Sequence, residues 1–511
     1  TMDGRYLMIG SESTETSEVH FLDLQQQQQT RDSHEPVAPH VQCLAQRRKK
    51  VLYEIDHRHG TWWIHSNVGN LPNYALFSAP AVAHCQDLWQ PVLLHGEPLF
   101  DGGPGHRSLD DVTCLDSHVL LSGREDGLPR IWLVTLDEEE KDTLDQDNSQ
   151  CSDGKVQLSQ VERLEFEEEA FDVGLAANSD FYAKSVLIAY DSLVTPTQYI
   201  DIELNNSTNR QLIKERTVPG YDKTLYSSKR TTVLSRDGKT EIPVDLLYRK
   251  SVMEEYESSG QPVPVHMYGY GAYGSCEEAT FSSSLLPLLD RGIVYALAHV
   301  RGGGEMGRTW YEEPNGGKYL CKKNTFNDFV DVAKWLVDDA KLTTPDQLSC
   351  EGRSAGGLTV GASINQEPTL FRVAILGVPA VDMVATMADS SVNLVIVEWE
   401  EWGNPNEAKF FDYMKHYSPM ENVKPNAIYP SCLLSGGLND PRVQYWEPAK
   451  MTAQLRHGAA AKEDRCICLK MEMNAGHFSE SDRYKYWREL AFDYAFLLDQ
   501  LGLAPTESKR T

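Results

Sequence analysis

The hydrophobic rhythm of the sequence changes near residue 217, and this change constrains the possible folds more than any other feature. Before it, short apolar segments such as SEVHFLDL, TWWIHSNV, HVLLSGRE and KSVLIAYDS alternate with polar turns, and helical periodicity is almost absent. After it, apolar runs that end in Gly- or Asn-rich turns alternate with helical segments. In NDFVDVAKWLVDDA, for example, apolar residues recur at 329, 332, 333, 336 and 337, which predicts a helix. Two rhythms of this kind predict two domains.

The two predicted domains differ in fold class. Residues 1–217 carry regularly spaced short strands, which are typical of a sandwich, a barrel or a propeller. Residues 218–511 alternate strands with helices, so we expect a mainly parallel sheet with helices on both faces. In sheets of this type ligands bind at the carboxyl ends of the strands, and the Gly-rich runs fall at those ends.

Composition excludes several classes of partner. The chain has 48 Lys and Arg against 75 Asp and Glu, a net charge of −27, whereas nucleic acids and anionic membranes attract basic surfaces. No run of about 18 apolar residues is present, so we expect no membrane-spanning segment. The ten cysteines show no C-x-x-C pairs or matching histidine spacing, and the opening TMDGRYLMIGSESTE lacks the order of a signal peptide. We therefore expect reduced thiols, a cytoplasmic location, no metal site and no cofactor.

One short motif in the second half carries chemistry. Residues 352–356, GRSAG, fit G-x-S-x-G, the strand-to-helix elbow that presents a nucleophilic serine in α/β-hydrolases. The glycines have a steric reason, because side chains beside the nucleophile would collide with the crossing strand and helix. A chance glycine turn would look the same by itself, so the interpretation depends on the residues that follow.

Three residues at successive strand ends complete the pattern. Ser354 follows the LSCE strand, Asp440 ends PSCLLSGGLND, and His477 follows CICLKMEMNAG. Taken singly, the Asp is more often a turn residue and the His a packing residue, but Ser, Asp, His is the chain order of α/β-hydrolases. The imidazole would take the serine proton and the carboxylate would orient the imidazole. We expect the backbone N–H of Ala355 and the hydroxyl of Tyr270 to donate to the oxyanion.

A longer set of motifs makes the resemblance specific. YGYGAYG, HVRGGGEMGRTWY, KNTFNDFVDVAKWL, GRSAGG, EWEEWGNP, YSPMENV, NDPRV and NAGHF together resemble the prolyl oligopeptidase family, and more closely its oligopeptidase B branch. The match covers essentially all of 220–511, while EEAFDVG and YDSLVTPTQ upstream resemble the end of that family's seven-bladed propeller. The family consists of cytosolic serine peptidases that cut short peptides, and this branch cuts after Arg and Lys. The resemblance therefore implies an α/β-hydrolase domain preceded by an all-β, propeller-like domain, with short basic peptides as substrates.

The resemblance also assigns roles residue by residue. The three residues of the predicted triad fall on the family's nucleophile, acid and base, and Tyr270 falls on its oxyanion tyrosine. Arg442 matches an arginine that binds substrate beside the nucleophile. In VEWEEW, Glu398 and Glu400 match acidic positions associated with Arg or Lys at P1. Glu278 falls on one of the branch's two second-subsite carboxylates, but Thr280 stands at the other, which leaves a basic preference at P2 open.

The two glutamates of VEWEEW also make physical sense. A P1 guanidinium that enters a pocket loses water, and a carboxylate offers it both opposite charge and paired hydrogen bonds. In an extended segment Glu398 and Glu400 would point to one face. Without the resemblance, a solvated acidic edge would be the more economical interpretation of such a cluster.

Length and pocket chemistry define the alternatives. Only about 217 residues precede the predicted hydrolase domain, enough for four or five blades at roughly 40–45 residues each, so we expect an N-terminally incomplete propeller. A prolyl-specific peptidase would need an uncharged aromatic P1 pocket, which Glu398 contradicts. An esterase or lipase could share the same elbow, and a truncated, non-catalytic binding protein is the non-enzymatic alternative. The oligomeric state stays open.

Overall fold

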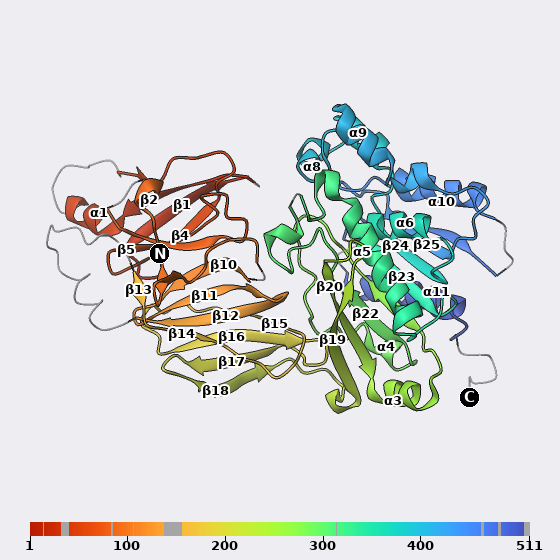
Figure 1. Cartoon of the computed structure of the whole chain (residues 1–511), viewed down its shortest axis with the longest axis horizontal. Coiled ribbons are helices and arrows are strands. Elements are labelled where there is room, and N and C mark those ends of the chain that lie inside the picture. The colour runs from red at the N-terminus through yellow and green to blue at the C-terminus, as the bar shows by residue number, and fades with distance from the viewer. Residues whose placement is uncertain are drawn as a thin grey trace. The chain divides into compact units, whose positions relative to one another are not determined.

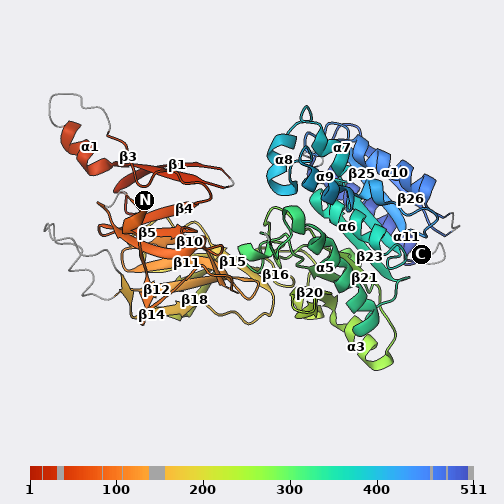
Figure 2. The ribbon, with the colours of Figure 1, turned by 45° about the horizontal axis from the view of Figure 1, so that its top comes forward.

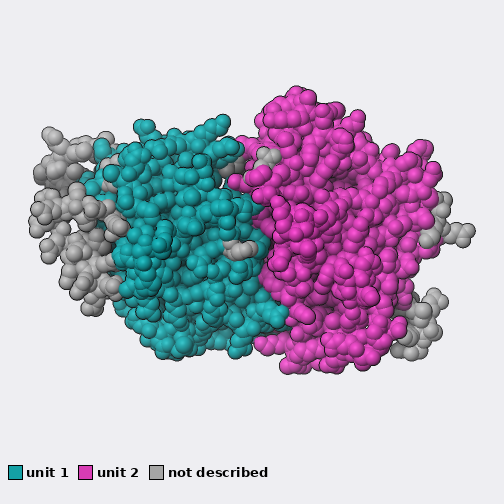
Figure 3. Space-filling model, viewed as in Figure 1, with its two compact units in different colours: residues 1–217, 306–309 teal, residues 218–305, 310–511 magenta. Residues whose placement is uncertain are grey.

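The structure is a computed structural model, and it divides into two compact units (Figure 3). It describes residues 1–13, 15–31, 40–82, 85–105, 107–136, 156–312, 314–460, 464–478 and 482–504. Unit 1 comprises residues 1–217 and 306–309, and unit 2 comprises residues 218–305 and 310–511.

Unit 1 is built from small sheets, most of them antiparallel (Figures 1 and 2). The first sheet has the order β1 (Tyr6–Glu12), β2 (Ser17–Asp23), β3 (Gln42–Cys43), and the second β4 (Tyr53–Arg58), β5 (Thr61–Ser66), β6 (Ala75–Pro80), β7 (Gln90–Pro91). The third is β10 (Arg107–Cys114), β11 (His118–Glu125), β12 (Leu128–Thr135), β14 (Gln160–Arg163), and the fourth β15 (Phe171–Leu175), β16 (Ser185–Ser192), β17 (Gln198–Glu203), β18 (Asn206–Glu215). A minor sheet joins β13 (Gln157–Leu158), β8 (Leu93–Leu94) and β9 (Glu97–Pro98). The helix α1 (Leu24–Arg31) and the short helix Gln86–Leu88 complete the unit's described elements outside residues 306–309.

These sheets pack face to face because successive side chains of a strand point to opposite faces. In β5, Trp62 packs in the cluster shared with the first sheet, whereas its neighbour Trp63 packs in the cluster shared with the third. The third sheet does the same, since Leu121 of β11 joins one cluster and Leu120 joins the next, with the fourth sheet. A succession of small sheets joined by shared cores confirms the predicted propeller-like β fold.

Unit 2 has one eight-stranded sheet at its centre (Figures 1 and 2). Its order is β19 (Tyr226–Leu234), β20 (Glu241–Arg249), β22 (Val294–Ala298), β21 (Val265–Tyr268), β23 (Leu348–Arg353), β24 (Val373–Gly377), β25 (Ser431–Gly437), β26 (Ile467–Glu472). The pairs β19–β20 and β20–β22 are antiparallel, and every pair from β22 onwards is parallel. The predicted mainly parallel sheet is therefore confirmed.

Helices cover both faces of this sheet. The helices of this unit are α3 (Lys250–Ser259), α4 (Leu286–Leu289), α5 (Lys323–Lys334), α6 (Ala355–Gln366), α7 (Met383–Ala388), α8 (Val395–Trp402), α9 (Ala408–Lys415), α10 (Trp446–Gly458) and α11 (Arg483–Gln500). Of these, α7, α8 and α9 pack in one cluster with α6. Short helical turns span Lys223–Leu225, Arg308–Trp310, Tyr319–Cys321, Trp335–Asp339 and Pro419–Asn422. In the described part of the chain, no helix is both long and apolar enough to cross a membrane.

The strand β24 shows how the two faces are filled. Ala374 and Leu376 pack with α5, α6 and α10, whereas Val373 and Ile375 pack with α4 and α11. All five residues of this strand are buried, as expected for a central parallel strand covered on both sides. The predicted helix in NDFVDVAKWLVDDA is α5, with Phe329 at its buried face. The carboxyl ends of β23, β25 and β26 then carry the predicted site.

Candidate active site

Ser354 occupies the turn between β23 and α6. Its backbone has φ +55° and ψ −120°. Residues other than glycine rarely adopt this conformation, which costs about 1–3 kcal/mol. A Cβ on Gly352 would lie 2.1 Å from the carbonyl oxygen of Gly356, and one on Gly357 would lie 2.4 Å from Cβ of Pro379. Glycine at these two positions thus allows β23 and α6 to approach closely, so that the sharp turn between them presents the Ser354 side chain.

The structure brings the three predicted triad residues together. Nε2 of His477 lies 3.0 Å from Oγ of Ser354, and its Nδ1 lies 2.7 Å from Oδ2 of Asp440. The other carboxylate oxygen of Asp440 accepts the backbone N–H groups of Arg442 and Val443 at 2.8 and 3.0 Å. Asp440 and His477 are both buried. This relay can take a proton from the serine hydroxyl and return it to a leaving group.

Two donors flank the serine. Ala355 is the first residue of α6, where backbone N–H groups have no partner within the helix. Burial raises the pKa of the Tyr270 phenol to about 12, the carboxylates nearby add to this, and a hydrogen bond with Ser354 opposes it. Tyr270 therefore keeps its proton at neutral pH and can donate it to a developing oxyanion.

A cavity of about 420 Å³ opens beside the triad. It is lined by Tyr268, Tyr270, Glu277, Glu351, Arg353, Ser354, Val378, Arg442, His477, Phe478, Tyr486, Glu489, Leu490 and Asp493. Arg442 is exposed, with its guanidinium 5.1 Å from the centre of the Phe478 ring. Burial raises the pKa values of Glu277 and Asp493 to about 7. Arg442 thus lines the same cavity as Ser354, whereas Glu278 is not among the lining residues and its neighbour Glu277 is.

The glutamates of VEWEEW lie on a helix, so the predicted extended segment is wrong. They belong to α8, where residues two apart point in nearly opposite directions. Glu398 is half-buried, and its Oε2 accepts the hydroxyl of Tyr273 and Nε1–H of Trp402, both at 2.7 Å. Glu400 is exposed and does not share a face with Glu398. The i, i+4 spacing on the helix brings the indole of Trp402 within hydrogen-bond distance of the Glu398 carboxylate.

Two buried charged residues near the site escaped the sequence analysis. Glu401, next to the predicted pair, is buried and faces the loop that carries Tyr270. Lys322 is also buried, and its Nζ lies 3.7 Å from Oε1 of Glu401. Charged residues in EWEEW and CKKN indicate a solvated surface, so no local signal marked either one.

One cluster in unit 1 has the composition of a metal site, which the sequence analysis did not expect. The ligand atoms of Glu18, His20 and Cys43 lie within 4.8 Å of one another, and all three residues are half-buried. His20 and Cys43 pair across β2 and β3, so strand register and not sequence spacing brings them together. Carboxylate, imidazole and thiolate are ligands suited to Zn²⁺.

Together, the sheet and the relay at its rim have the architecture of the α/β-hydrolase class. A family model described as "Prolyl oligopeptidase family" matches residues 279–504, and one described as "Prolyl oligopeptidase, N-terminal beta-propeller domain" matches residues 1–216. The chain belongs to the prolyl oligopeptidase family, as the motifs predicted, and within it to the oligopeptidase B branch.

Individual relatives support this placement. "Protease 2" of Moraxella lacunata is 34% identical over 510 residues, which are 99% of this chain and 65% of the relative. Oligopeptidase B from Leishmania major has a TM-score of 0.83 and 37% identity, over 100% of this chain and 66% of that one. Oligopeptidase B from Trypanosoma brucei, with covalently bound antipain, has a TM-score of 0.83 and 40% identity over 99% and 66%. The chain thus spans less than two thirds of the length of these relatives.

Proposed function

We propose that this protein is a serine oligopeptidase that hydrolyses short peptides on the carboxyl side of Arg or Lys. The observation that carries the proposal is the unbroken relay of hydrogen bonds from Ser354 through His477 to Asp440, at 3.0 and 2.7 Å. Membership of the prolyl oligopeptidase family supports a peptide substrate, and relatives named oligopeptidase B support a basic residue at P1.

Acylation follows from the relay. His477 takes the proton of Ser354 through Nε2 while Oγ attacks the scissile carbonyl carbon, and Asp440 holds the Nδ1–H and stabilises the imidazolium. The negative charge on the carbonyl oxygen is met by the Tyr270 hydroxyl and the N–H of Ala355. The imidazolium then gives its proton to the leaving amine as the C–N bond breaks. A water molecule repeats the sequence on the ester, which releases the acid and restores the serine.

Glu398 is the residue we assign to P1 recognition. Its Oε2 is held by Tyr273 and Trp402, whereas its Oε1 accepts no hydrogen bond from any residue in the described ranges. A fixed carboxylate with one open oxygen suits a guanidinium or ammonium group. Glu400 and Glu278, which the resemblance also assigns to substrate binding, are proposed as outer contacts for basic residues.

The test separates the reaction from its specificity. A fluorophosphonate probe should label the native protein and not Ser354→Ala, because only an activated serine reacts. An unlabelled but folded native protein would support the non-catalytic alternative. Chromogenic Arg, Pro and ester substrates are then compared, and we expect hydrolysis of the Arg amide to exceed that of the Pro amide. Faster cleavage after Pro would contradict the P1 assignment but not the serine peptidase mechanism.

A further inference from the structure

The loop that carries the oxyanion tyrosine is held from several sides. The carbonyl of Tyr270 accepts the hydroxyl of Thr359 at 2.8 Å, and the amide of Gly274 donates to the carbonyl of Gly302 at 3.0 Å. Between them, Tyr273 has φ +61°, a strained value for a residue with a side chain. Contacts with the surrounding structure must therefore hold the backbone of residues 271–273 in this conformation.

A buried ion pair holds that central part. Nζ of Lys322 donates to the carbonyl oxygen of Gly271, and Oε1 of Glu401 accepts the amide of Tyr273 at 3.1 Å. The two charges lie 3.7 Å apart, with side chains 1% and 3% exposed. The hydroxyl of Tyr311 donates to the other carboxylate oxygen of Glu401. One cation and one anion thus hydrogen-bond to two consecutive peptide groups of the loop, through the carbonyl of Gly271 and the amide of Tyr273.

A buried ion pair stabilises a protein core less effectively than apolar side chains do. Taking two charges out of water costs several kcal/mol per ion, and apolar residues of similar volume often give equal or greater stability. The pKa of Lys322 is lowered to about 8 by burial, although the nearby Glu401 opposes that effect, which shows how little solvent reaches it. A geometric role explains such a pair better than a stabilising one.

The loop also connects catalysis to recognition. The hydroxyl of Tyr273 donates to Glu398, the residue assigned to P1, while its amide donates to Glu401 on the same helix. Tyr270, three residues earlier, lines the same cavity as Ser354. A displacement of the loop would therefore move the oxyanion donor relative to the nucleophile.

We propose that Lys322 and Glu401 are positioning residues, which fix the Tyr270–Tyr273 loop so that the Tyr270 hydroxyl points at the oxyanion. The inference rests on the proposed serine hydrolase mechanism but not on the Arg specificity. Neither residue touches the substrate, and both act through Tyr270.

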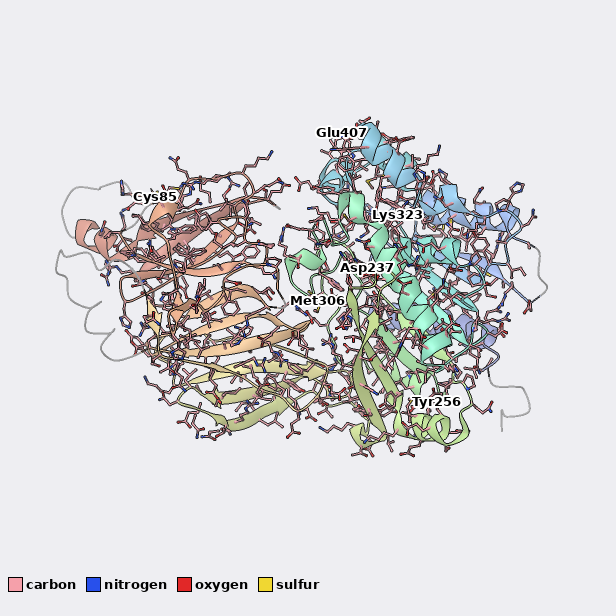
Figure 4. The ribbon with its side chains drawn as sticks, in the orientation of Figure 1. Cys85, Asp237, Tyr256, Met306, Lys323 and Glu407 are labelled. Carbon is pink, nitrogen blue, oxygen red and sulfur yellow. The ribbon has the colours of Figure 1, made fainter. Side chains whose placement is uncertain are left out.

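A double-mutant cycle tests this dependence. Lys322→Met and Glu401→Gln are each made in the native and in the Tyr270→Phe background. The matched control is Lys323→Met, the adjacent lysine (Figure 4). Lys323 is half-buried, and its Nζ lies 5.3 Å from the centre of the Tyr413 ring. The readouts are kcat and KM for an Arg peptide amide and the second-order rate of inactivation by a fluorophosphonate. The second readout needs the serine, the histidine and the oxyanion donors, but no P1 pocket.

In the native background we expect kcat and the inactivation rate to fall by about 10- to 100-fold, while KM changes by less than about threefold. In the Tyr270→Phe background the same substitutions should cost less than about threefold, because the donor that they position is gone. Lys323→Met should leave all readouts near native. Thermal unfolding shows which variants fold, and if Lys322→Met does not, the isosteric Glu401→Gln decides.

If Lys322→Met or Glu401→Gln lowers kcat by the same factor in the Tyr270→Phe background as in the native background, the inference is overturned. Such a result would mean that the substitution acts by a general structural effect, which does not depend on the Tyr270 hydroxyl. A folded Glu401→Gln with native kcat would overturn it too. If the native protein cuts no Arg amide yet reacts with the fluorophosphonate, only the proposed specificity fails, and the cycle is read from inactivation rates. If it does not react at all, the serine hydrolase mechanism and this inference both fail.

Discussion

Replacing Glu398 by Gln is the sharpest test of P1 recognition. Gln keeps an oxygen that can accept from Tyr273 and Trp402, so the local contacts of Oε2 survive. It removes the negative charge and turns the open oxygen into an N–H donor, which faces the donors of a guanidinium. Breaking a buried charged pair costs about 2–5 kcal/mol, and the half-buried position of Glu398 favours the lower part of that range. At 1.36 kcal/mol per tenfold, a loss of about 2–3 kcal/mol is a fall of roughly 30- to 150-fold in kcat/KM.

The assay compares two peptide amides that differ only at P1, one with Arg and one with its uncharged isostere citrulline. In the native protein we expect a strong preference for Arg, and in Glu398→Gln a ratio near one. Glu400→Gln is the comparison variant, because Glu400 lies on the same helix but is exposed and proposed only as an outer contact, so it should change the ratio by less than about threefold. An unchanged Arg preference in Glu398→Gln would refute the assignment, and a collapse in Glu400→Gln would transfer it.

Three further outcomes follow from the site. Tyr270→Phe should lower kcat by about 100- to 1000-fold with little change in KM, measured on an Arg amide, and a near-native kcat would leave Ala355 as the main donor. Gly352→Ala should lower the melting temperature or the soluble yield strongly, because its Cβ would lie 2.1 Å from a carbonyl oxygen; Gly174→Ala, with open space at its Cβ, is the control. Asp493→Asn should raise the melting temperature at pH 8. The folded-state pKa of about 7 exceeds the ordinary 3.8, so the carboxyl destabilises the fold increasingly as pH rises from about 4 to 7, by up to about 4 kcal/mol. The gain should shrink towards pH 4, and a gain independent of pH would contradict this cause.

The spatial assembly of the three proposed triad residues could be predicted because each follows its own strand. The sequence places Ser354, Asp440 and His477 after apolar runs, and parallel strands deliver their carboxyl ends to one rim. Strand order along the chain was then enough to assemble the relay, without knowledge of any side-chain contact.

The helix α8 could not be predicted in the same way. The letters V-E-W-E-E-W begin as an alternation of apolar and charged residues, which indicates a strand. The i, i+4 contact between Glu398 and Trp402 requires the helix instead, and tertiary packing decides between the two. The burial of Lys322 could not be predicted from the sequence either. Its partner Glu401 is 79 positions away in the chain, and only the folded structure brings the two side chains together.

Arg442 performs two separable tasks. Its main-chain amide donates to the carboxylate of Asp440, whereas its guanidinium lies over the ring of Phe478 and lines the cavity. Any amino acid except proline supplies the same amide, so the guanidinium can be exchanged without loosening the acid. A substitution at this position would therefore reshape the lining of the cavity while the backbone anchor of Asp440 stays in place.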